Sequence, residues 1–166
     1  MTSETIIQVN SQGQALGPID KIKAHQGPGV LHRALTVSLQ NQQGQILITQ
    51  RSKKKPLWPL YWDLACSTHP HYPHETIIEA SIRRLPFELG LDIKQVKNLQ
   101  ETHAYEYHAV YNQNWSENEI NHLVVGDFSG KLNLNSDEVA DYRWVKTLDY
   151  KKFIFAPWVK LTESKL

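Results

Sequence analysis

The segment PHETIIEASIRRLPFELG, residues 73–90, most constrains how this chain can fold. Four apolar residues recur there at helical spacing: Ile77, Ile78, Ile82 and Leu85. Gly90 follows as a stop signal, and Pro86 removes one backbone hydrogen bond, so we expect a kinked last turn or a short helix. One well-marked helix in mid-chain must pack on a sheet formed by the segments on either side of it.

Strand signals surround this helix. Residues 30–51, VLHRALTVSLQNQQGQILITQR, contain two runs rich in Val, Ile, Leu and Thr joined across NQQGQ, which predicts a hairpin. Residues 4–17 predict a short strand, a glycine turn and a second extended piece. Further strands are expected at 98–111, 117–130 and 137–145, and a closing helix at 153–166. The pattern predicts an α/β (α+β) sandwich.

Length, charge and cysteine content limit the class of protein. A chain of 166 residues with 40% hydrophobic content suits one domain, residues 1–166. A net charge of +1 gives no general attraction to nucleic acid or acidic membranes, and no apolar run approaches 18 residues, so we expect no membrane span. The lone cysteine and the absence of a signal-peptide pattern favour a reducing cytoplasm.

Histidines and glutamates form the first candidate constellation. His25 and His32 bracket the turn QGPG, His69 follows the cysteine, and Glu117 and Glu119 lie two apart on one expected strand face. Such a set could hold Zn²⁺, Mn²⁺ or Mg²⁺. Each residue alone is more typical of a polar surface. The other histidines are interpreted as surface or packing residues, notably His71, His74, His103 and His122.

The second constellation is cationic and could bind a phosphate or diphosphate. Its members follow one strand or lie on the helix: Arg51, Lys53, Lys54, Lys55, Arg83 and Arg84. The alternative for SKKK is a solvated loop.

The helix also reproduces much of the spacing G-x5-E-x7-R-E-U-x-E-E-x-G-U of the Nudix helix. The matching residues are Glu75, Arg83, Leu85, Glu88 and Gly90. Arg84 and Phe87 stand where the middle glutamates would be, so most of the metal cluster of a diphosphate hydrolase is missing. The pattern therefore supports hydrolysis poorly.

Seven motifs occur together in order, over a match that runs from about Lys21 to Trp158: DKIKAHQGPGVLHRA, TQRSKKKPLWPLYW, THP, IRRLPFELG, EYHAVYNQNWSENEI, DEVADYRW and FAPW. In this combination the chain resembles the type 1 isopentenyl diphosphate isomerases, a branch of the Nudix superfamily. The resemblance implies a Nudix-type α/β/α sandwich around a mixed β-sheet. It also implies a 1,3-allylic proton shift that interconverts isopentenyl and dimethylallyl diphosphate.

The resemblance assigns roles position by position. The residues implied to bind a divalent metal are His25, His32, His69, Glu117 and Glu119, with Glu119 also the acid that protonates the double bond. Glu88 would bind Mg²⁺ together with the diphosphate. The implied diphosphate contacts are Lys21, Arg51, Lys55 and Arg84. Tyr107 matches the active-site tyrosine, and Trp158 the tryptophan that faces the substrate's branched carbon.

The implied cofactors are Mg²⁺ and a second divalent metal, Mn²⁺, Zn²⁺ or Mg²⁺. The implied partner is a small-molecule prenyl diphosphate, bound by a monomer or weak homodimer.

The chain departs from the family at the catalytic cysteine. Family members carry this cysteine two residues before the metal-binding histidine, where this chain has Ser67, and Cys66 lies one position further away. Adjacent residues of an extended segment project to opposite sides, so only one of the two can face the pocket. A gapless alignment puts Ser67 there, whereas a bulge would restore Cys66. We favour the gapless alignment because a bulge disrupts backbone pairing.

Three functional hypotheses follow. The first is an isopentenyl diphosphate isomerase, with slow, absent or redirected turnover if a serine replaces the thiol. The others are an impaired isomerase-like protein that binds a prenyl or other diphosphate, and a Nudix hydrolase of another diphosphate. The chain stops eight residues after Trp158, where family members continue with more helix, so the lid over the pocket is expected to be incomplete.

Overall fold

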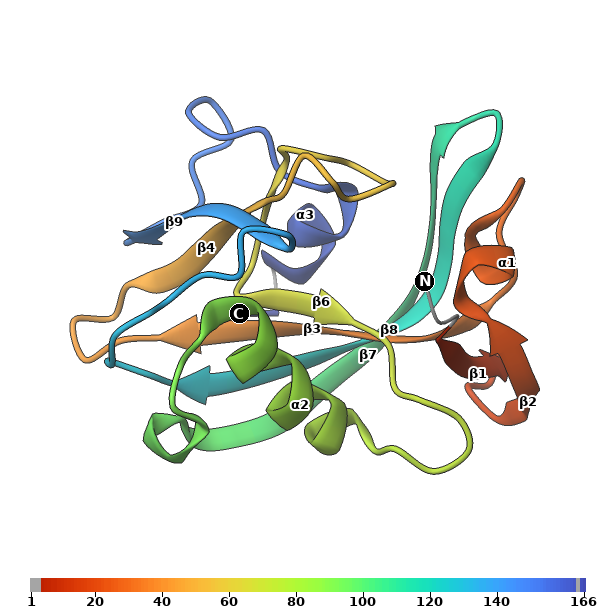
Figure 1. Cartoon of the computed structure of the whole chain (residues 1–166), viewed down its shortest axis with the longest axis horizontal. Helices are drawn as coiled ribbons and strands as arrows, with labels where there is room; N and C mark the ends of the chain where they lie inside the picture. Colours follow the sequence, from red (N-terminus) through yellow and green to blue (C-terminus); the bar gives the residue numbers. More distant parts are fainter. Residues whose placement is uncertain (1–3, 164) are drawn as a thin grey trace.

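The computed structural model describes residues 4–163, 165 and 166 (Figure 1). Its elements in chain order are β1 (Thr5–Val9), β2 (Ala15–Asp20), α1 (Lys21–His25), β3 (His32–Gln40), β4 (Ile46–Arg51), β5 (Trp62–Asp63), β6 (Cys66–Thr68), α2 (Ile77–Leu89), the 3₁₀ turn η1 (Ile93–Gln95), β7 (Lys97–Asn112), β8 (Trp115–Asp127), β9 (Val139–Val145) and α3 (Pro157–Glu163).

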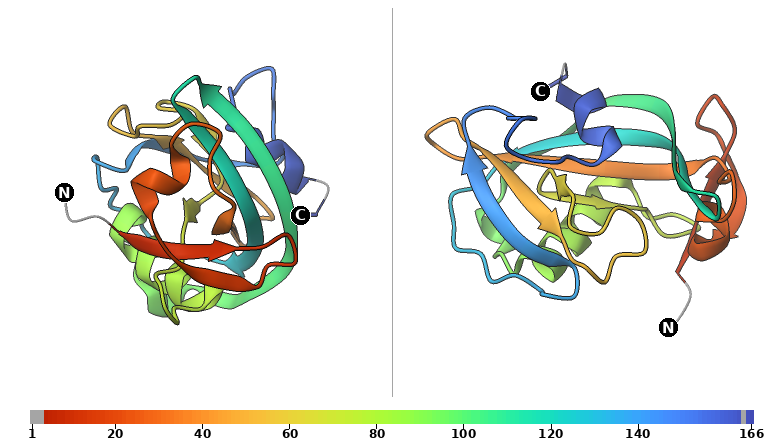
Figure 2. Two further views of the ribbon diagram at one scale, coloured as in Figure 1. Left: turned by 90° about the vertical axis from the view of Figure 1, so that its right-hand side faces the viewer. Right: turned by 90° about the horizontal axis from the view of Figure 1, so that it is seen from above.

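A mixed sheet forms the centre of the fold. Strand β3 runs parallel to β8 in register from His32↔Glu119 to Gln40↔Asp127, and β7 pairs antiparallel with the other edge of β8. Strand β6 pairs antiparallel with β3, while β9 and β5 pair antiparallel with β4. Helices α2 and α3 lie on opposite sides of this sheet (Figures 1 and 2). The α/β sandwich around a mixed sheet is confirmed.

The predicted hairpin at residues 30–51 is wrong beyond its turn. Strands β3 and β4 share only the pair Gln40↔Ile46 and then separate. Strand β3 is buried along nearly its whole length because β8 and β6 pair with it, so its long apolar run is that of a central strand. Both strands contribute to the pocket described below: Leu35 and Thr36 of β3 and Arg51 at the end of β4 line it.

Helix α2 forms as the sequence predicts, with one correction. It runs through Pro86 to Leu89, so the expectation of a short helix is wrong. Thr76 and Glu79 make a reciprocal capping box at its start, and Gly90 adopts a φ of 59° at its end. A proline in the last turn removes one bond, while the buried face of the helix keeps its packing.

Two apolar clusters fill the two sides of the sheet. On the α2 side, Leu35, Val37 and Leu39 of β3 pack with Leu85 and Leu89. On the α3 side the cluster is largely aromatic, with Trp58, Tyr107, Phe153 and Trp158. Among the described residues, no helix combines the length and hydropathy needed to cross a membrane.

Helix α3 is shorter than the predicted 153–166. It begins at Pro157, because Phe155 forms an isolated bridge with Trp62 and the Ala156 N–H donates to the Trp62 carbonyl. Proline is favoured at a first helical position, where its missing N–H has no partner to lose.

Candidate active site

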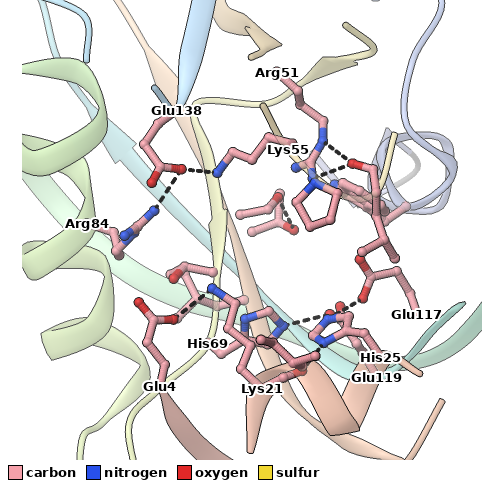
Figure 3. Close-up of a pocket in the computed structure, with 18 of the residues that line it drawn as sticks. Glu4, Lys21, His25, Arg51, Lys55, His69, Arg84, Glu117, Glu119 and Glu138 are labelled. Carbon is pink, nitrogen blue, oxygen red and sulfur yellow. Dashed lines mark hydrogen bonds and ion pairs between the residues drawn. The ribbon is translucent and has the colours of Figure 1, made fainter. Parts of the chain in front are cut away.

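One pocket of about 730 Å³, a size suited to a small ligand, is lined by side chains from the sheet and from helices α1, α2 and α3 (Figure 3). Its lining combines three kinds of side chain. The aromatic and apolar members include Leu57, Tyr107, Trp115 and Trp158; the cations are Lys21, Arg51, Lys54, Lys55 and Arg84; and His25, His69, Glu117 and Glu119 form a polar end. Most of the predicted site residues therefore line this one cavity although they come from distant parts of the sequence.

Strand register brings the histidines and glutamates together. Glu119 on β8 stands opposite His32 on β3 and Tyr107 on β7, so the three side chains share one face of the sheet. Glu117 lies two residues earlier on the same face. The ligand atoms of His25, His32, His69, Glu117 and Glu119 all lie within 4.8 Å of one another.

Backbone carbonyl groups orient two of the imidazole rings. His25 Nδ1 lies 2.6 Å from the Lys21 carbonyl oxygen, and His32 Nδ1 lies 2.7 Å from that of Val30. Because a carbonyl only accepts, Nδ1 carries a proton in both rings, and the Nε2 atoms point into the cluster. His32 Nε2 is buried and has no hydrogen-bond partner in the described part of the chain. This donor set fits a divalent cation with imidazole and carboxylate ligands.

The charges inside the cluster are strongly coupled. Burial and the charge of Glu119 raise the pKa of Glu117 above its usual range. Burial also acts to raise the pKa of Glu119, but His32 and His69 outweigh it and hold that pKa well below the usual range. Burial lowers the pKa of His25, yet Glu117, whose Oε2 is 2.9 Å from His25 Nε2, raises it to about 8. The two carboxylates repel each other in this buried site, and a bound cation would relieve that repulsion.

The two oxygens of Glu119 face different neighbours. Its Oε1 lies 3.0 Å from His69 Nε2 and 3.4 Å from His32 Nε2. Its Oε2 accepts a 2.7 Å hydrogen bond from the Tyr107 hydroxyl, whose pKa is raised by burial and by Glu119. One carboxylate oxygen is therefore directed at the imidazoles and the other at the aromatic part of the pocket.

The aromatic side of the pocket centres on Trp158. This residue is almost completely buried, meets Trp58 edge-on with ring centres 5.5 Å apart, and lies 6.3 Å from the Tyr107 ring centre. Its indole N–H donates a 2.8 Å hydrogen bond to Asp63 Oδ1, and the Arg51 guanidinium lies 5.2 Å from its ring centre. The ring face is thus fixed from several directions.

Strand register also separates Ser67 from Cys66. Ser67 pairs with Thr36 and lines the pocket, whereas Cys66 pairs with Val37 and packs into the apolar cluster under α2. Burial raises the pKa of the Cys66 thiol well above its usual range. Strand β6 shows no register shift against β3, so the position facing the cavity holds a serine, as in the gapless alignment.

The four predicted diphosphate contacts all line the pocket, and each already has an acidic partner. Lys21 pairs with Glu4 at 2.7 Å, and Arg51 lies 3.5 Å from Asp63 while its other nitrogens donate to loop carbonyls. Lys55 pairs with Glu138. Arg84 pairs with Glu88 at 2.5 Å and with Glu138 at 3.3 Å. In Figure 3, Glu138 lies between Lys55 and Arg84.

Glu88, the predicted Mg²⁺ ligand, is only 4% exposed and contacts Arg84. Burial acts to raise its pKa, but Lys55 and Arg84 outweigh this and hold it below the usual range. Glu88 therefore stays ionised next to the cations of the pocket.

Sequence analysis missed four polar residues that support the site. These are Asp63, Asn121, Glu138 and Glu4. Asp63 carried a signal, because a carboxylate inside the apolar run YWDLAC has to be buried with partners. Asn121 and Glu138 gave no comparable pattern. Asn121 donates to Thr36, 85 positions away, and to Tyr105 on a different strand. The partners of Glu138 are Lys55, 83 positions away, and Arg84 on α2.

The fold is that of a Nudix domain. A model of the NUDIX domain family matches residues 30–161. A solved structure of a protein from Deinococcus radiodurans superposes with a TM-score of 0.67 at 20% identity, covering 86% of this chain and 83% of that one. A MutT protein from Methanosarcina mazei gives a TM-score of 0.60 at 16% identity, covering 81% and 91%.

Curated relatives narrow the family. An isopentenyl-diphosphate Delta-isomerase from Klebsiella pneumoniae is 35% identical over 97% of this chain and 89% of its own length. The enzyme of that name from Escherichia coli is 32% identical over 96% and 89%. The chain therefore belongs to the isopentenyl-diphosphate Delta-isomerase family within the NUDIX domain family.

Proposed function

We propose that this protein interconverts isopentenyl and dimethylallyl diphosphate by moving one double bond. The observation that carries the proposal is the position of Glu119, between the imidazoles and the Tyr107 hydroxyl in an aromatic pocket that is also lined by lysines and arginines. The names of the relatives agree with it.

The cations supply the binding energy for the diphosphate. Lys21, Lys55 and Arg84 converge on the pocket, and an anionic ligand can replace their present carboxylate partners. Arginine offers forked hydrogen bonds to phosphate oxygens and lysine a compact charge. Holding the diphosphate here leaves the short prenyl chain to enter the aromatic part, where water is excluded.

The residues of the polar end can then supply the first proton. His32 and His69 keep Glu119 ionised in the ligand-free site, and the low pKa makes its protonated form a strong acid. In that form Glu119 gives a proton to the terminal CH₂ of the alkene, and the electron pair of the double bond forms the new C–H bond. A tertiary carbocation results at the branched carbon. The Trp158 and Tyr107 rings stabilise this charge through their faces, and the buried surroundings strengthen the interaction.

The residues that would hold the first divalent metal are His25, His32, His69, Glu117 and Glu119. Such an ion, Mn²⁺, Zn²⁺ or Mg²⁺, acts as a Lewis acid that makes a bound carboxylic acid a stronger proton donor. Glu88, ionised beside Arg84 and Lys55, is the residue we propose for a Mg²⁺ shared with the diphosphate.

A product analysis tests the proposal against its alternatives. Purified protein is incubated with isopentenyl diphosphate, Mg²⁺ and Mn²⁺, and the products are separated by chromatography while phosphate release is measured. We expect dimethylallyl diphosphate without phosphate release, and a loss of at least about 100-fold in Glu119→Gln. Phosphate release would instead indicate a hydrolase. A ligand-induced rise in melting temperature with no product would indicate a binding protein.

A further inference from the structure

The Ser67 side chain contacts a buried carboxylate, that of Asp63. Its hydroxyl donates a 3.2 Å hydrogen bond to Asp63 Oδ1, and it lies 3.1 Å from the Thr36 hydroxyl. Ser67 lines the pocket, while Asp63 stands directly behind it at 3% exposure. A carboxylate is thus held one hydroxyl away from the cavity.

Hydrogen-bond donors and an arginine surround the Asp63 carboxylate. Oδ1 accepts hydrogen bonds from the Trp158 indole N–H and from the Leu64 backbone N–H, both at 2.8 Å, in addition to the Ser67 hydroxyl. Arg51 lies 3.5 Å from Oδ2. Burial nevertheless raises the pKa of Asp63 above its usual range, with Arg51 opposing. Asp63 is therefore a stronger base than a solvated aspartate and is still held in place by charge and hydrogen bonds.

We propose that Asp63, acting through the Ser67 hydroxyl, accepts the second proton of the isomerisation. The inference rests on the proposed function and concerns the step after the carbocation forms. A serine hydroxyl alone is a poor acceptor, because it has no ionised form near neutral pH comparable to a thiolate. The Asp63 carboxylate, which accepts a hydrogen bond from this hydroxyl, can take up the proton that serine alone cannot hold.

The step balances in atoms and electrons. The C–H bond at the carbon next to the cation breaks, and its electron pair forms the new double bond of the allylic product. The proton binds Ser67 Oγ while the hydroxyl proton of Ser67 passes to Asp63 Oδ1. Asp63 ends neutral and returns its proton to solvent between turnovers, or delivers it through Ser67 in the reverse reaction.

Asp63 also connects the base to the ring that faces the cation. The same Oδ1 that accepts from Ser67 fixes the Trp158 indole. This shared contact fixes the position of Ser67 relative to the aromatic face. The hydroxyl and the ring can therefore contact the same substrate molecule. In this scheme Ser67 is the catalytic residue that touches substrate, and Asp63 is the positioning residue and proton acceptor behind it.

A double-mutant cycle with Asp63→Asn and Ser67→Cys tests the inference. Asparagine keeps the size and an acceptor oxygen but cannot take up a proton. We expect Asp63→Asn to lower kcat by about 100-fold or more, within the range for general acid–base groups, with KM changed by less than about threefold. In the Ser67→Cys background, where a thiol can accept the proton itself, the same change should cost less than about fivefold.

A surface control and a second variant complete the design. Asp141→Asn, the same substitution in an exposed pair with Arg143 on β9, should leave kcat unchanged. Ser67→Ala tests the relay without disturbing the buried carboxylate and should lose as much activity as Asp63→Asn. Wild-type kcat in Ser67→Ala, or an equal cost of Asp63→Asn in both backgrounds, would overturn the inference and leave the isomerase function intact.

Failure of the proposed function gives a different pattern. If neither the natural chain nor Ser67→Cys forms dimethylallyl diphosphate, the function itself is wrong, and the inference is wrong with it. If only Ser67→Cys forms product, the protein has the isomerase pocket, but the pair of Asp63 and Ser67 does not replace a thiol.

Discussion

Glu117→Gln tests the proposed metal site through stability and needs no substrate. In the metal-free protein this change removes the contact of Glu117 with His25 but also the repulsion between Glu117 and Glu119. The two effects oppose each other, so we expect the free energy of unfolding to change by about 1 kcal/mol. The large effect should appear only when metal is added.

The size of that effect follows from linkage. A metal at 100 times its Kd stabilises the folded state by about 2.7 kcal/mol, or about 5–11 °C in Tm for a chain of this length. Losing one ligand should weaken binding by at least about 100-fold, so the same metal concentration then adds only about 0.4 kcal/mol, near 1 °C.

The assay is thermal unfolding of chelator-treated protein across a Mn²⁺ titration. Glu101→Gln is the matched control, because Glu101 on β7 also pairs with a histidine, His122 on β8 at 2.7 Å, and does not line the pocket. This control should keep the full metal-dependent rise in Tm. A Glu117→Gln variant that keeps the same rise, or a Glu101→Gln variant that loses it, would refute the assignment of the site.

Three further predictions concern the binding pocket and its loop. Glu138→Gln should tighten binding of inorganic diphosphate in metal-free buffer by about tenfold, because its two cationic partners become available; calorimetry showing weaker binding would contradict this. Leu60 has a φ of 65°, a backbone conformation that costs a leucine energy but not a glycine. Leu16 in β2 is similarly exposed but is not among the residues with positive φ, so Leu16→Gly should lower the free energy of unfolding more than Leu60→Gly does, by at least about 1 kcal/mol in urea unfolding. Burial acts to raise the pKa of Glu4, but Lys21 outweighs it and lowers that pKa from 4.5 to about 2; stability from this pair is present above pH 4.5 and fades as pH falls toward 2. NMR titration should return Glu4 to its usual range in Lys21→Met, and an unchanged midpoint would contradict the pairing.

Local signals predicted the helix and most strands. Helical spacing, a glycine stop and β-rich runs are properties of short segments, and α2, β7, β8 and β9 follow them closely. The pairing of β3 did not follow from its sequence. The turn at residues 41–45 suggested a hairpin, but the main partners of β3 are β8 and β6. Pairing between strands so far apart in the sequence cannot be predicted from the residues of one short segment.

The candidate site shows the same division. His32, Glu119 and Tyr107 meet because three strands pair in one register, which the sequence alone could not supply. Residue type and spacing suggested His32 and Glu119 as a metal set, and only the order of several motifs added Tyr107. The distinction between Ser67 and Cys66 needed the register of β6 against β3, because the alternation of side chains says that they face opposite ways but not which faces the cavity.

The most direct test of the proposed proton shift follows a label rather than a rate. The metal-loaded protein is incubated with isopentenyl diphosphate in D₂O, and the products are examined by NMR and mass spectrometry. Protonation of the terminal CH₂ places deuterium in a methyl group of dimethylallyl diphosphate, and Glu119→Gln should abolish this labelling. Recovery of unlabelled isopentenyl diphosphate, with neither deuterium nor allylic product above background, would contradict the account.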